Sequence, residues 1–301
     1  DAGVKSDRIA AVVVTRNRIQ LLRRCVEALR AQTRSLEEII VVDNGSSDGT
    51  AAWLRGSPDL IVVRQGNAGS AGGQHAGIKQ AIERGHDWVW CMDDDGYPAT
   101  DALGRLCAAR SLLPATWLNS LVVNESDPER LAFWLPGVQH RDVKTLRSRG
   151  DILPSANPFN GTLLAARLIE SVGLPFPELF IWGDEVEFQA RCHRDGQLVV
   201  TVADSIFFHP ESIPPRICEM PRRALWKCFY MVRNQAAAPG PDGRARLCTT
   251  AAIAKGLEVI AGAMSIMTSR PLDALLLIWM AWSGMVAAAR KDLSLKYVPS
   301  G

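Results

Sequence analysis

Three consecutive aspartates, Asp93, Asp94 and Asp95, follow the apolar and aromatic run at residues 87–92. Adjacent carboxylates repel one another, and an ionised carboxylate is not buried alone, so the cluster raises the question of what neutralises it. Asp93 and Asp95 are two residues apart at the end of a predicted buried strand, so both can reach one hard cation, Mn²⁺ or Mg²⁺. A divalent metal with a bound diphosphate would neutralise the cluster and suits nucleotide-sugar chemistry. An acidic turn that caps the next helix is the structural alternative.

Polar residues also follow the other predicted strands. Asp43 and Asn44 end the strand in VVDNGSSDGT, where a carboxylate can accept a hydrogen bond from a base N–H. Arg16 follows the first strand, and the glycine loop at residues 66–73 allows backbone amides to approach a ligand closely. Its spacing, GxxGxxG, matches neither the dinucleotide fingerprint nor the P-loop. The order of these segments along the chain therefore carries more information than any one of them.

Strands and helices alternate in the first hundred residues. Apolar runs predict strands within residues 8–17, 37–50, 60–65 and 87–92. The intervening segment 18–33 is predicted to be a helix whose apolar face holds Leu21, Leu22, Cys25, Val26 and Leu29. This pattern predicts an α/β fold with a mostly parallel sheet covered on both faces, in which ligands collect at the carboxyl ends of the strands.

The remainder of the chain divides into two further parts. Residues 99–154 are less regular, and a strand-then-helix pattern at 159–173 and a late strand ending at His209 follow. We predict a catalytic domain over residues 1–210, with a nucleotide-sugar half at about 8–98 and an acceptor half at about 99–210. A helical region is predicted over residues 211–301.

Composition and charge limit the function classes. The chain has 301 residues, is 47% apolar and 22% charged, and carries a formal net charge of +2, so it is globular and nothing in its charge requires nucleic acid. Seven cysteines without CxxC spacing predict reduced core residues in the cytoplasm rather than a disulfide or zinc framework. The sequence starts at Asp1 without a leader pattern, from which trimming is expected.

The C-terminal region has a membrane-like composition. Residues 275–289 are apolar or small, but this run of 15 is shorter than the roughly 20 residues that a spanning helix needs. Arg290 and Lys291 follow it, and the segment at 222–233 mixes basic and aromatic residues as interfacial helices do. We predict peripheral association with the inner face of the cell membrane; a packing helix or a homo-oligomer contact is the alternative.

Four segments, VVVTRNR, IIVVDNGSSDGT, GNAGSAGGQHAGI and WCMDDDGYP, resemble in order and spacing the GT-A inverting glycosyltransferases of the family that includes cellulose, chitin and hyaluronan synthases. FIWGDEVEFQARCHRDG is similar to the stretch that carries the general base, and FFHP to the late metal-binding histidine. The resemblance covers residues 8–235 and is closest to the actinobacterial galactofuranosyltransferases that initiate cell-wall galactan. Rhamnosyltransferases share FYMVRN. Two departures are His75, where Asn is common, and an Asp184–Glu185 pair in place of Glu–Asp.

The resemblance implies roles for individual residues. Asp43 would meet uracil, Asp93 and Asp95 would bind ribose and metal, and His209 would complete the metal site. The nucleotide-sugar site implied is Thr15, Arg16, Asp43, Asn44, Asn67, Gly69, Asp93 and Asp94. A satisfied histidine beside a proline turn is the alternative for His209.

On the acceptor side the resemblance places Glu185 at the position of the general base, with Asp184 holding the acceptor or the loop; which of the two is the base stays open. A helix-capping Asp184 beside a solvated Glu185 is the structural alternative. Trp182 could stack on a sugar or belong to the core. Arg233 and Asn234 are expected to contact the acceptor or the sugar.

The reaction expected is a metal-dependent, inverting transfer. The protein would bind UDP-galactofuranose, deprotonate a hydroxyl of a polyprenyl-diphosphate-linked saccharide, and displace UDP in line. A rhamnosyltransferase that uses dTDP-rhamnose is the nearest alternative. A catalytically silent nucleotide-sugar-binding or membrane scaffold protein is the alternative from another class.

Overall fold

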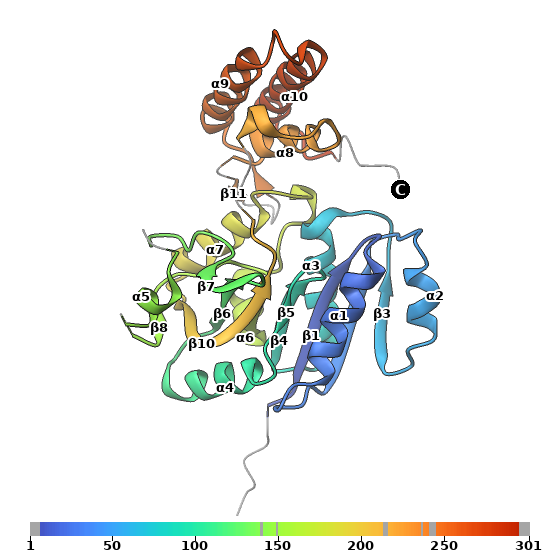
Figure 1. The fold of residues 1–301 in the computed structure, drawn as a ribbon, viewed down its shortest axis with the longest axis vertical. Helices are drawn as coiled ribbons and strands as arrows, with labels where there is room; N and C mark the ends of the chain where they lie inside the picture. The colour runs from blue at the N-terminus through green and yellow to red at the C-terminus, as the bar shows by residue number, and fades with distance from the viewer. Residues whose placement is uncertain are drawn as a thin grey trace, which may run out of the picture.

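A computed structural model of the chain describes residues 7–138, 141–148, 150–212, 216–235, 237–240 and 245–294. One large sheet carries helices on both faces, and a layer of three helices lies above the carboxyl ends of its strands (Figure 1). The strands are β1 (Ile9–Thr15), β2 (Glu38–Asp43), β3 (Leu60–Arg64), β4 (Trp88–Asp93), β5 (Tyr97–Pro98), β6 (Trp117–Asn124), β7 (Asp127–Leu131), β8 (Ile152–Leu153), β9 (Asn160–Ala165), β10 (Val199–His209), β11 (Ala238–Pro239) and β12 (Ala245–Arg246).

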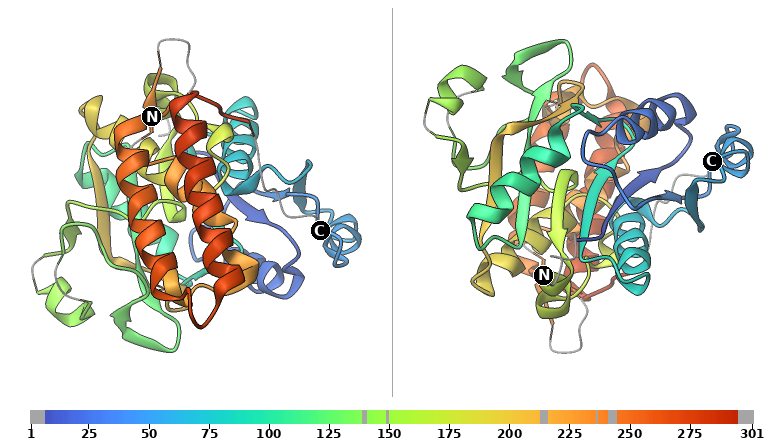
Figure 2. Two further views of the ribbon diagram at one scale, coloured as in Figure 1. Left: turned by 90° about the horizontal axis from the view of Figure 1, so that it is seen from above. Right: turned by 90° about the horizontal axis from the view of Figure 1, so that it is seen from below.

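The α-helices are α1 (Ile19–Arg30), α2 (Thr50–Arg55), α3 (Gly69–Glu83), α4 (Ala102–Leu112), α5 (Val143–Arg147), α6 (Ala166–Val172), α7 (Asp184–Arg194), α8 (Lys227–Arg233), α9 (Thr249–Ser265) and α10 (Pro271–Ala289). Three short 3₁₀ turns are η1 (Pro177–Leu179), η2 (Ile217–Glu219) and η3 (Arg222–Ala224). Helices α1 and α4 cover one face of the sheet, and α3 and α6 cover the other (Figure 2).

The strand order along the sheet is β3-β2-β1-β4-β9-β6-β10-β5. β1 pairs in parallel with β2 and β4, β2 with β3, and β6 with β10, whereas β9 runs antiparallel to its neighbours β4 and β6. The α/β prediction is confirmed, with β9 as the reversed strand of the central path. Thr15 is in register with Asp43, and Val14 with Asp93, so polar residues that follow three strands lie at one edge.

Sequence explains how closely the helices approach the sheet. In α1, Leu22, Cys25, Val26 and Leu29 are buried as predicted, and Leu21 is half-buried. In α3, a Cβ atom on Gly73 would overlap the Val14 side chain. The glycines of α3 therefore let its backbone lie directly against β1, where the donor site is built.

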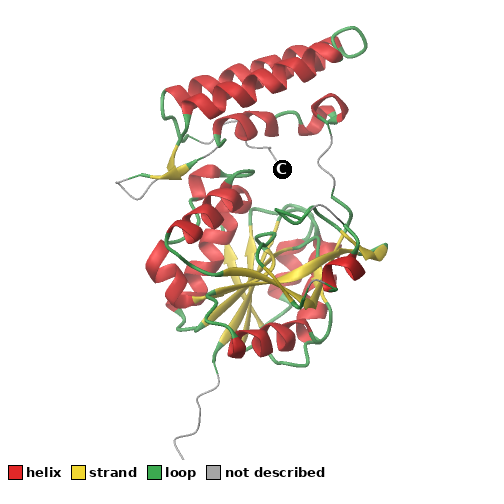
Figure 3. Cartoon of the chain, turned by 90° about the vertical axis from the view of Figure 1, so that its left-hand side faces the viewer, coloured by secondary structure: helices red, strands yellow, loops and turns green. Residues whose placement is uncertain are grey.

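The helical layer has its own apolar cluster, formed mainly by α8, α9 and α10. The cluster also includes Phe176, Leu179 and Phe180 from the loop before α7, so the layer packs on the catalytic part through that loop (Figure 3). The predicted boundary near residue 210 falls where β10 ends and stays a prediction.

α10 has 19 residues and is longer than the predicted apolar run. By length and composition it could cross a membrane, although 44% of its apolar window is buried inside the protein.

Candidate active site

A cavity of about 450 Å³ lies at the carboxyl ends of the strands, between the sheet and the helical layer. Six separate segments of the chain contribute residues that sequence reasoning had identified one by one. The predicted site residues that line it are Thr15, Arg16, Asn44, Asn67, Gly69, Asp93, Asp94, Asp95, Trp182, Asp184, Glu185 and His209. The fold thus gathers both the donor-side and the acceptor-side predictions into one cleft.

The three aspartates are held by different partners. Asp93 accepts a hydrogen bond from Gln74 at 3.1 Å, and Asp94 accepts one from the Thr15 hydroxyl at 2.7 Å. Arg18 bridges Asp94 and Asp95, with its Nη1 at 3.2 and 2.7 Å from their carboxylate oxygens. Burial, followed by the neighbouring carboxylates, raises the pKa of Asp93 to about 7, which marks an unfavourable excess of negative charge.

His209 is oriented towards this cluster. Its Nδ1 lies 2.7 Å from the carbonyl oxygen of Pro210, which can only accept, so Nδ1 donates and Nε2 faces the cleft. Nε2 lies 3.2 Å from Asp95 Oδ1. Although burial acts to raise the pKa of Asp95, the hydrogen bond and charge of His209, together with Arg18, lower it to about 2.

The donor chemistry of this cluster suits a divalent cation. Two carboxylates and an imidazole nitrogen that a carbonyl holds in place are ligands that Mn²⁺ accepts. Within the described residues, no three such side chains are close enough together to form a ready metal site. Asp95 instead forms ion pairs with Arg18 and His209. The residue types therefore fit a metal, and binding one requires these contacts to rearrange.

Asp43 is placed where a base can be recognised. It is fully buried at the end of β2, and its Oδ1 accepts a hydrogen bond from the backbone N–H of Ser46 at 2.8 Å. Its buried Oδ2 has no hydrogen-bond partner among the described residues, and Arg64 Nε lies 3.6 Å away. A buried acceptor without a donor is costly, and an imide N–H of a pyrimidine would satisfy it.

The glycine loop is fastened to the opposite wall of the cleft. Asn44 donates from Nδ2 to the Gly69 carbonyl at 2.9 Å, and Asn67 Oδ1 accepts from the Gly69 N–H at 3.2 Å. Gly69 has φ +71°, and a Cβ there would overlap the carbonyl oxygen of Phe180. Asn44 and Asn67 thus shape the loop as well as line the cavity.

Asp184 and Glu185 begin α7 and line the same cavity. Asp184 is buried, whereas Glu185 is half-buried. Burial, then the charge of Glu185 and a hydrogen bond with it, raises the pKa of Asp184 well above its usual range. Burial therefore favours the protonated form of Asp184, the less accessible member of the pair.

Several lining residues were missed by sequence reasoning. Lys227 and Trp226 reach the cavity from α8 and the turn before it, with Lys227 Nζ 5.3 Å from the centre of the Trp182 ring. Burial lowers the pKa of Lys227. Arg18 lies two residues beyond the predicted Arg16, so the VTRNR segment could have identified it as a site residue. No sequence pattern indicated that Lys227 lines the cavity.

Arg233 and Asn234 are not among the residues that line this cavity. Both are buried, at 0% and 2% exposure, behind the loop that precedes α7. Asn234 Nδ2 contacts the carbonyl oxygens of Leu179 and Trp182 at 2.7 and 2.8 Å. The predicted contact with acceptor or sugar is corrected on this point, because these side chains face backbone carbonyls and not the cleft.

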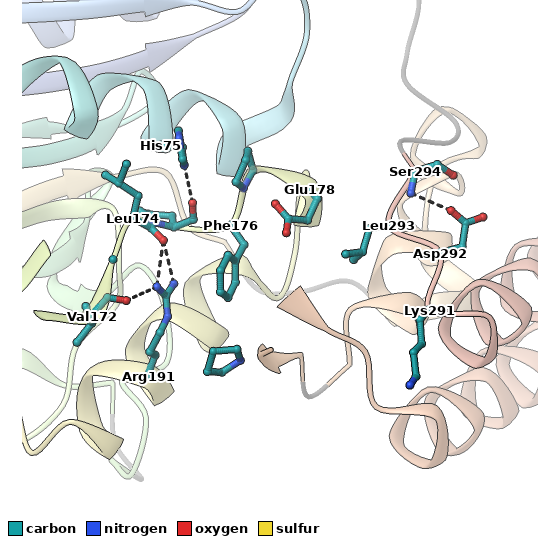
Figure 4. Close-up of a pocket in the computed structure, with 14 residues that line it drawn as sticks. His75, Val172, Leu174, Phe176, Glu178, Arg191, Lys291, Asp292, Leu293 and Ser294 are labelled. Carbon is teal, nitrogen blue, oxygen red and sulfur yellow. Dashed lines mark hydrogen bonds between the residues drawn. The ribbon is translucent and has the colours of Figure 1, made fainter. Parts of the chain in front are cut away.

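A second cavity, of about 890 Å³, is larger but chemically different (Figure 4). Arg191, which lines it, already donates hydrogen bonds to the Leu174 carbonyl at 3.1 Å and to the Glu187 carboxylate at 2.9 Å. His75, the departure noted in the sequence, bonds the Pro175 carbonyl through Nδ1 at 2.8 Å. We place the chemistry in the smaller cleft, because the strand-end carboxylates converge there.

This fold and cleft define a GT-A glycosyltransferase. Residues 10–119 match the family described as Glycosyl transferase family 2. The chain is 37% identical over 260 residues to the galactofuranosyltransferase GlfT1 of Mycobacterium tuberculosis (strain ATCC 25618 / H37Rv), covering 80% of this chain and 85% of that protein. It is also 37% identical over 213 residues to GlfT1 of Mycolicibacterium smegmatis, covering 67% of this chain and 70% of the relative. The chain belongs to glycosyltransferase family 2, and it is a glycosyltransferase.

Solved structures agree on the fold. GalNAc-T7 with UDP, GalNAc and Mn²⁺ aligns with a TM-score of 0.57 at 17% identity, covering 77% of this chain and 48% of that chain. S. aureus TarS 1–349 in complex with UDP aligns with a TM-score of 0.51 at 16% identity, covering 95% of this chain and 82% of that one. At these identities the likeness supports the GT-A fold alone.

Proposed function

We propose that this glycosyltransferase transfers galactofuranose from UDP-galactofuranose with inversion at the anomeric carbon. The supporting observation is a single cleft that holds a strand-end aspartate cluster and an acidic pair on another element, with the buried carboxylate of Asp43 next to Asn44, which lines the cleft. The two relatives named as galactofuranosyltransferases support the donor sugar. The alternative donor, dTDP-rhamnose, rests on the FYMVRN pattern at residues 229–234.

The donor would bind along the strand ends. Asp43 Oδ2 accepts the uracil N–H, and the cavity wall of Arg16, Asn67 and Gly69 surrounds the nucleotide. Half-buried Lys227 lines the same cavity as the aspartates and would bind the diphosphate there. Trp182 offers a ring face for the sugar.

A divalent cation would be held by Asp93, Asp95 and His209. Bound there, it would offset the negative charge that develops on the leaving diphosphate. Arg18 Nη1 lies 2.7 Å from Asp95 Oδ2 and neutralises the charge of that carboxylate. Asp95 would therefore bind the cation only after Arg18 moves away.

Glu185 would act as the general base. It is the accessible member of the acidic pair, whereas Asp184 is buried and its pKa is raised. The N-terminal dipole of α7 favours an ionised carboxylate at this position. Glu185 removes the proton from the acceptor hydroxyl while UDP leaves on the opposite side of the sugar, which inverts the anomeric centre.

The acceptor would be a polyprenyl-diphosphate-linked saccharide, and the protein would act peripherally at the cytoplasmic face of the membrane. The excess of positive charge after residue 210 supports this location. Residues 211–301 contain twelve Lys and Arg against six Asp and Glu, a net +6 in a chain of net +2.

The function is tested by incubating the protein with UDP-galactofuranose, UDP-glucose and dTDP-rhamnose in the presence of Mn²⁺, with and without a saccharide acceptor. We expect kcat/KM for release of the nucleoside diphosphate to be at least roughly 10²-fold higher with UDP-galactofuranose than with the other donors. Preference for dTDP-rhamnose would transfer the assignment to the alternative. No turnover with tight UDP binding would favour the silent binding protein.

A further inference from the structure

The outer face of the α9–α10 hairpin carries large apolar side chains that are exposed to solvent. The two helices lie side by side as the outermost layer of the molecule (Figure 2). Their exposed residues recur at intervals of three, four or seven positions, so they form a stripe on each helix. The outer face is Ile253, Leu257 and Met264 on α9 and Leu272, Leu275, Trp279 and Trp282 on α10.

This face concentrates the exposed apolar surface of the protein. Of the twelve large hydrophobic residues exposed within the described ranges, seven lie on it and the other five are scattered over the catalytic part. Leu272 is 65% exposed and Leu257 60%. Contiguous exposed patches of this kind mark interaction surfaces, whereas scattered residues do not.

The opposite side of α10 explains why the helix stays with the protein. Ala274, Leu277, Ala281 and Ala288 are buried against α8 and α9. A helix held along one side by its own domain can lie in the plane of an interface with its free side inserted, and it keeps its protein contacts there.

Charge identifies the occupant. Exposed Arg222 and Arg223 flank one end of the hairpin, and exposed Arg290 and Lys291 follow the other. Trp279 and Trp282 are in ring contact at 5.3 Å on the face itself, and tryptophan is enriched where membranes meet water. A second copy would bring the same positive rim against this one, which disfavours a symmetric dimer.

We propose that the outer face of α9 and α10 is the docking surface for an anionic lipid bilayer. The cleft is lined by the start of α8, which lies beneath α9 and α10 (Figure 3), so docking sets the active site about two helix diameters, roughly 20 Å, from the membrane. The proposal deepens the proposed function, on which it rests for the lipid-linked acceptor.

The test compares two triple variants of the full chain. L257S/L275S/W279S removes apolar side chains from the outer face. V62S/L112S/L198S removes exposed apolar side chains elsewhere and is the matched control. Because all six side chains are at least a third exposed, both variants should fold with unchanged melting temperature. Vesicles of phosphatidylcholine with phosphatidylglycerol, and of phosphatidylcholine alone, are the probes.

The wild type and the control should sediment with anionic vesicles, and the outer-face variant should partition at least roughly tenfold less. Equal partition of the two variants would overturn the proposal. It would also be overturned if the wild type did not bind anionic vesicles but formed a dimer, and the outer-face variant were a monomer. Transfer to a soluble saccharide is measured in parallel with the wild type and both variants. If none of the three proteins shows transfer, the proposed function is rejected, while the docking surface is still judged by vesicle binding.

A second inference concerns the loop that leads into α7. Phe180, Trp182 and Gly183 have φ of 65°, 57° and 102°, and two of the three are bulky residues for which positive φ is unfavourable. Asp184 follows directly, so the conformation of this loop sets where the acidic pair begins.

Two side chains of the helical layer hold the loop from behind. Asn234 Nδ2 lies within 2.7–3.1 Å of the carbonyl oxygens of Leu179, Ile181 and Trp182. Arg233 donates from Nη2 to the Glu178 carbonyl at 2.6 Å and from Nε to Asn234 Oδ1 at 2.9 Å. The backbone carbonyls of the strained loop are thereby fixed by one buried pair.

We infer that Arg233 and Asn234 are positioning residues for Asp184 and Glu185. They act through the loop and touch neither donor nor acceptor. Their function is to keep the N-terminus of α7 at the cleft in a conformation that the loop would not adopt alone.

The measurement is steady-state kinetics of Asn234→Ala, with the neighbouring amide Gln235→Ala as the control. A misplaced base lowers kcat, and we expect a loss of roughly 10- to 100-fold while KM for the donor stays within about twofold. Asn234→Ser keeps one donor and should recover part of the loss; it also serves if the alanine variant does not fold. A folded Asn234→Ala protein with wild-type kcat, or one whose loss appears only in melting temperature, would overturn the inference.

Discussion

The catalytic part and the helical layer distribute polar and apolar side chains in opposite ways. In residues 8–210, apolar strands fill the interior and carboxylates gather at the cleft. In the helical layer, Arg233 and Asn234 are fully buried while Leu272 and Trp279 are exposed. The first arrangement serves one ligand site, whereas the second serves two surfaces, one towards the catalytic loop and one outward.

The difference shows where binding energy is directed. In the helical layer, the buried side chains of Arg233 and Asn234 donate to loop carbonyls, so they stabilise a conformation and not a ligand. In the catalytic part, Asp43 keeps a buried oxygen without a hydrogen-bond donor and Asp93 lies among like charges, and a ligand would relieve both.

The largest effect is expected from the aspartate cluster. Asp95→Ala should reduce transfer by roughly 10³-fold or more, because it removes a ligand for the proposed cation, and excess EDTA should do the same to the wild type. Asp127→Asn, on the exposed strand β7, is the control. Full activity of the wild type in EDTA would break the link between this cluster and a metal.

The next effect concerns the acidic pair. Glu185→Gln keeps the shape and removes the proton acceptor, so turnover should fall by roughly 10²-fold or more while UDP binding, measured by calorimetry, survives. Near-normal turnover in Glu185→Gln together with an inactive Asp184→Asn would reverse the two assignments.

A glycine tests how tightly α3 packs against the loop before α7, on which the helical layer rests. A Cβ on Gly69 would overlap the Phe180 carbonyl at a positive φ, so Gly69→Ala should destabilise the fold by about 1–3 kcal/mol in urea unfolding. Gly66→Ala, where nothing lies within 4 Å of the added Cβ, should be close to neutral. Equal stability of the two variants would mean that the loop does not press on α3.

The smallest effect lies away from the cleft. The hydrogen bond from Arg84 is the largest influence on the pKa of Glu38 and lowers it. Burial acts to raise this pKa, but Arg84 and His86 together bring it down to about 2. Such a lowered pKa stabilises the fold above the unfolded value of about 4.5 and loses that stabilisation as the pH falls towards 2. Glu38→Gln should therefore cost less than about 1 kcal/mol at pH 7 and nothing near pH 2.

The measurement is urea unfolding of both proteins at several pH values, with Glu129→Gln on exposed β7 as the control. A stability difference that grows as the pH falls would contradict the assigned direction of the pKa shift.

The sequence by itself determined the strand ends and what they carry. Hydrophobic periodicity predicted β1, β2, β3 and β4, and short-range chemistry predicted Asp43, the aspartate cluster and Asp184–Glu185, because strand ends and helix starts are local features. The order of these segments was enough to predict the α/β fold and one cleft.

Only the tertiary structure decided which side each remaining residue faces. Arg233 and Asn234 belong to a visible pattern, yet their partners are carbonyls more than fifty residues away. Lys227 reaches the cleft because α8 packs over the loop before α7. α10 is apolar around its whole circumference, so composition could not tell its buried side from its exposed one; that choice depends on which side packs against α8 and α9.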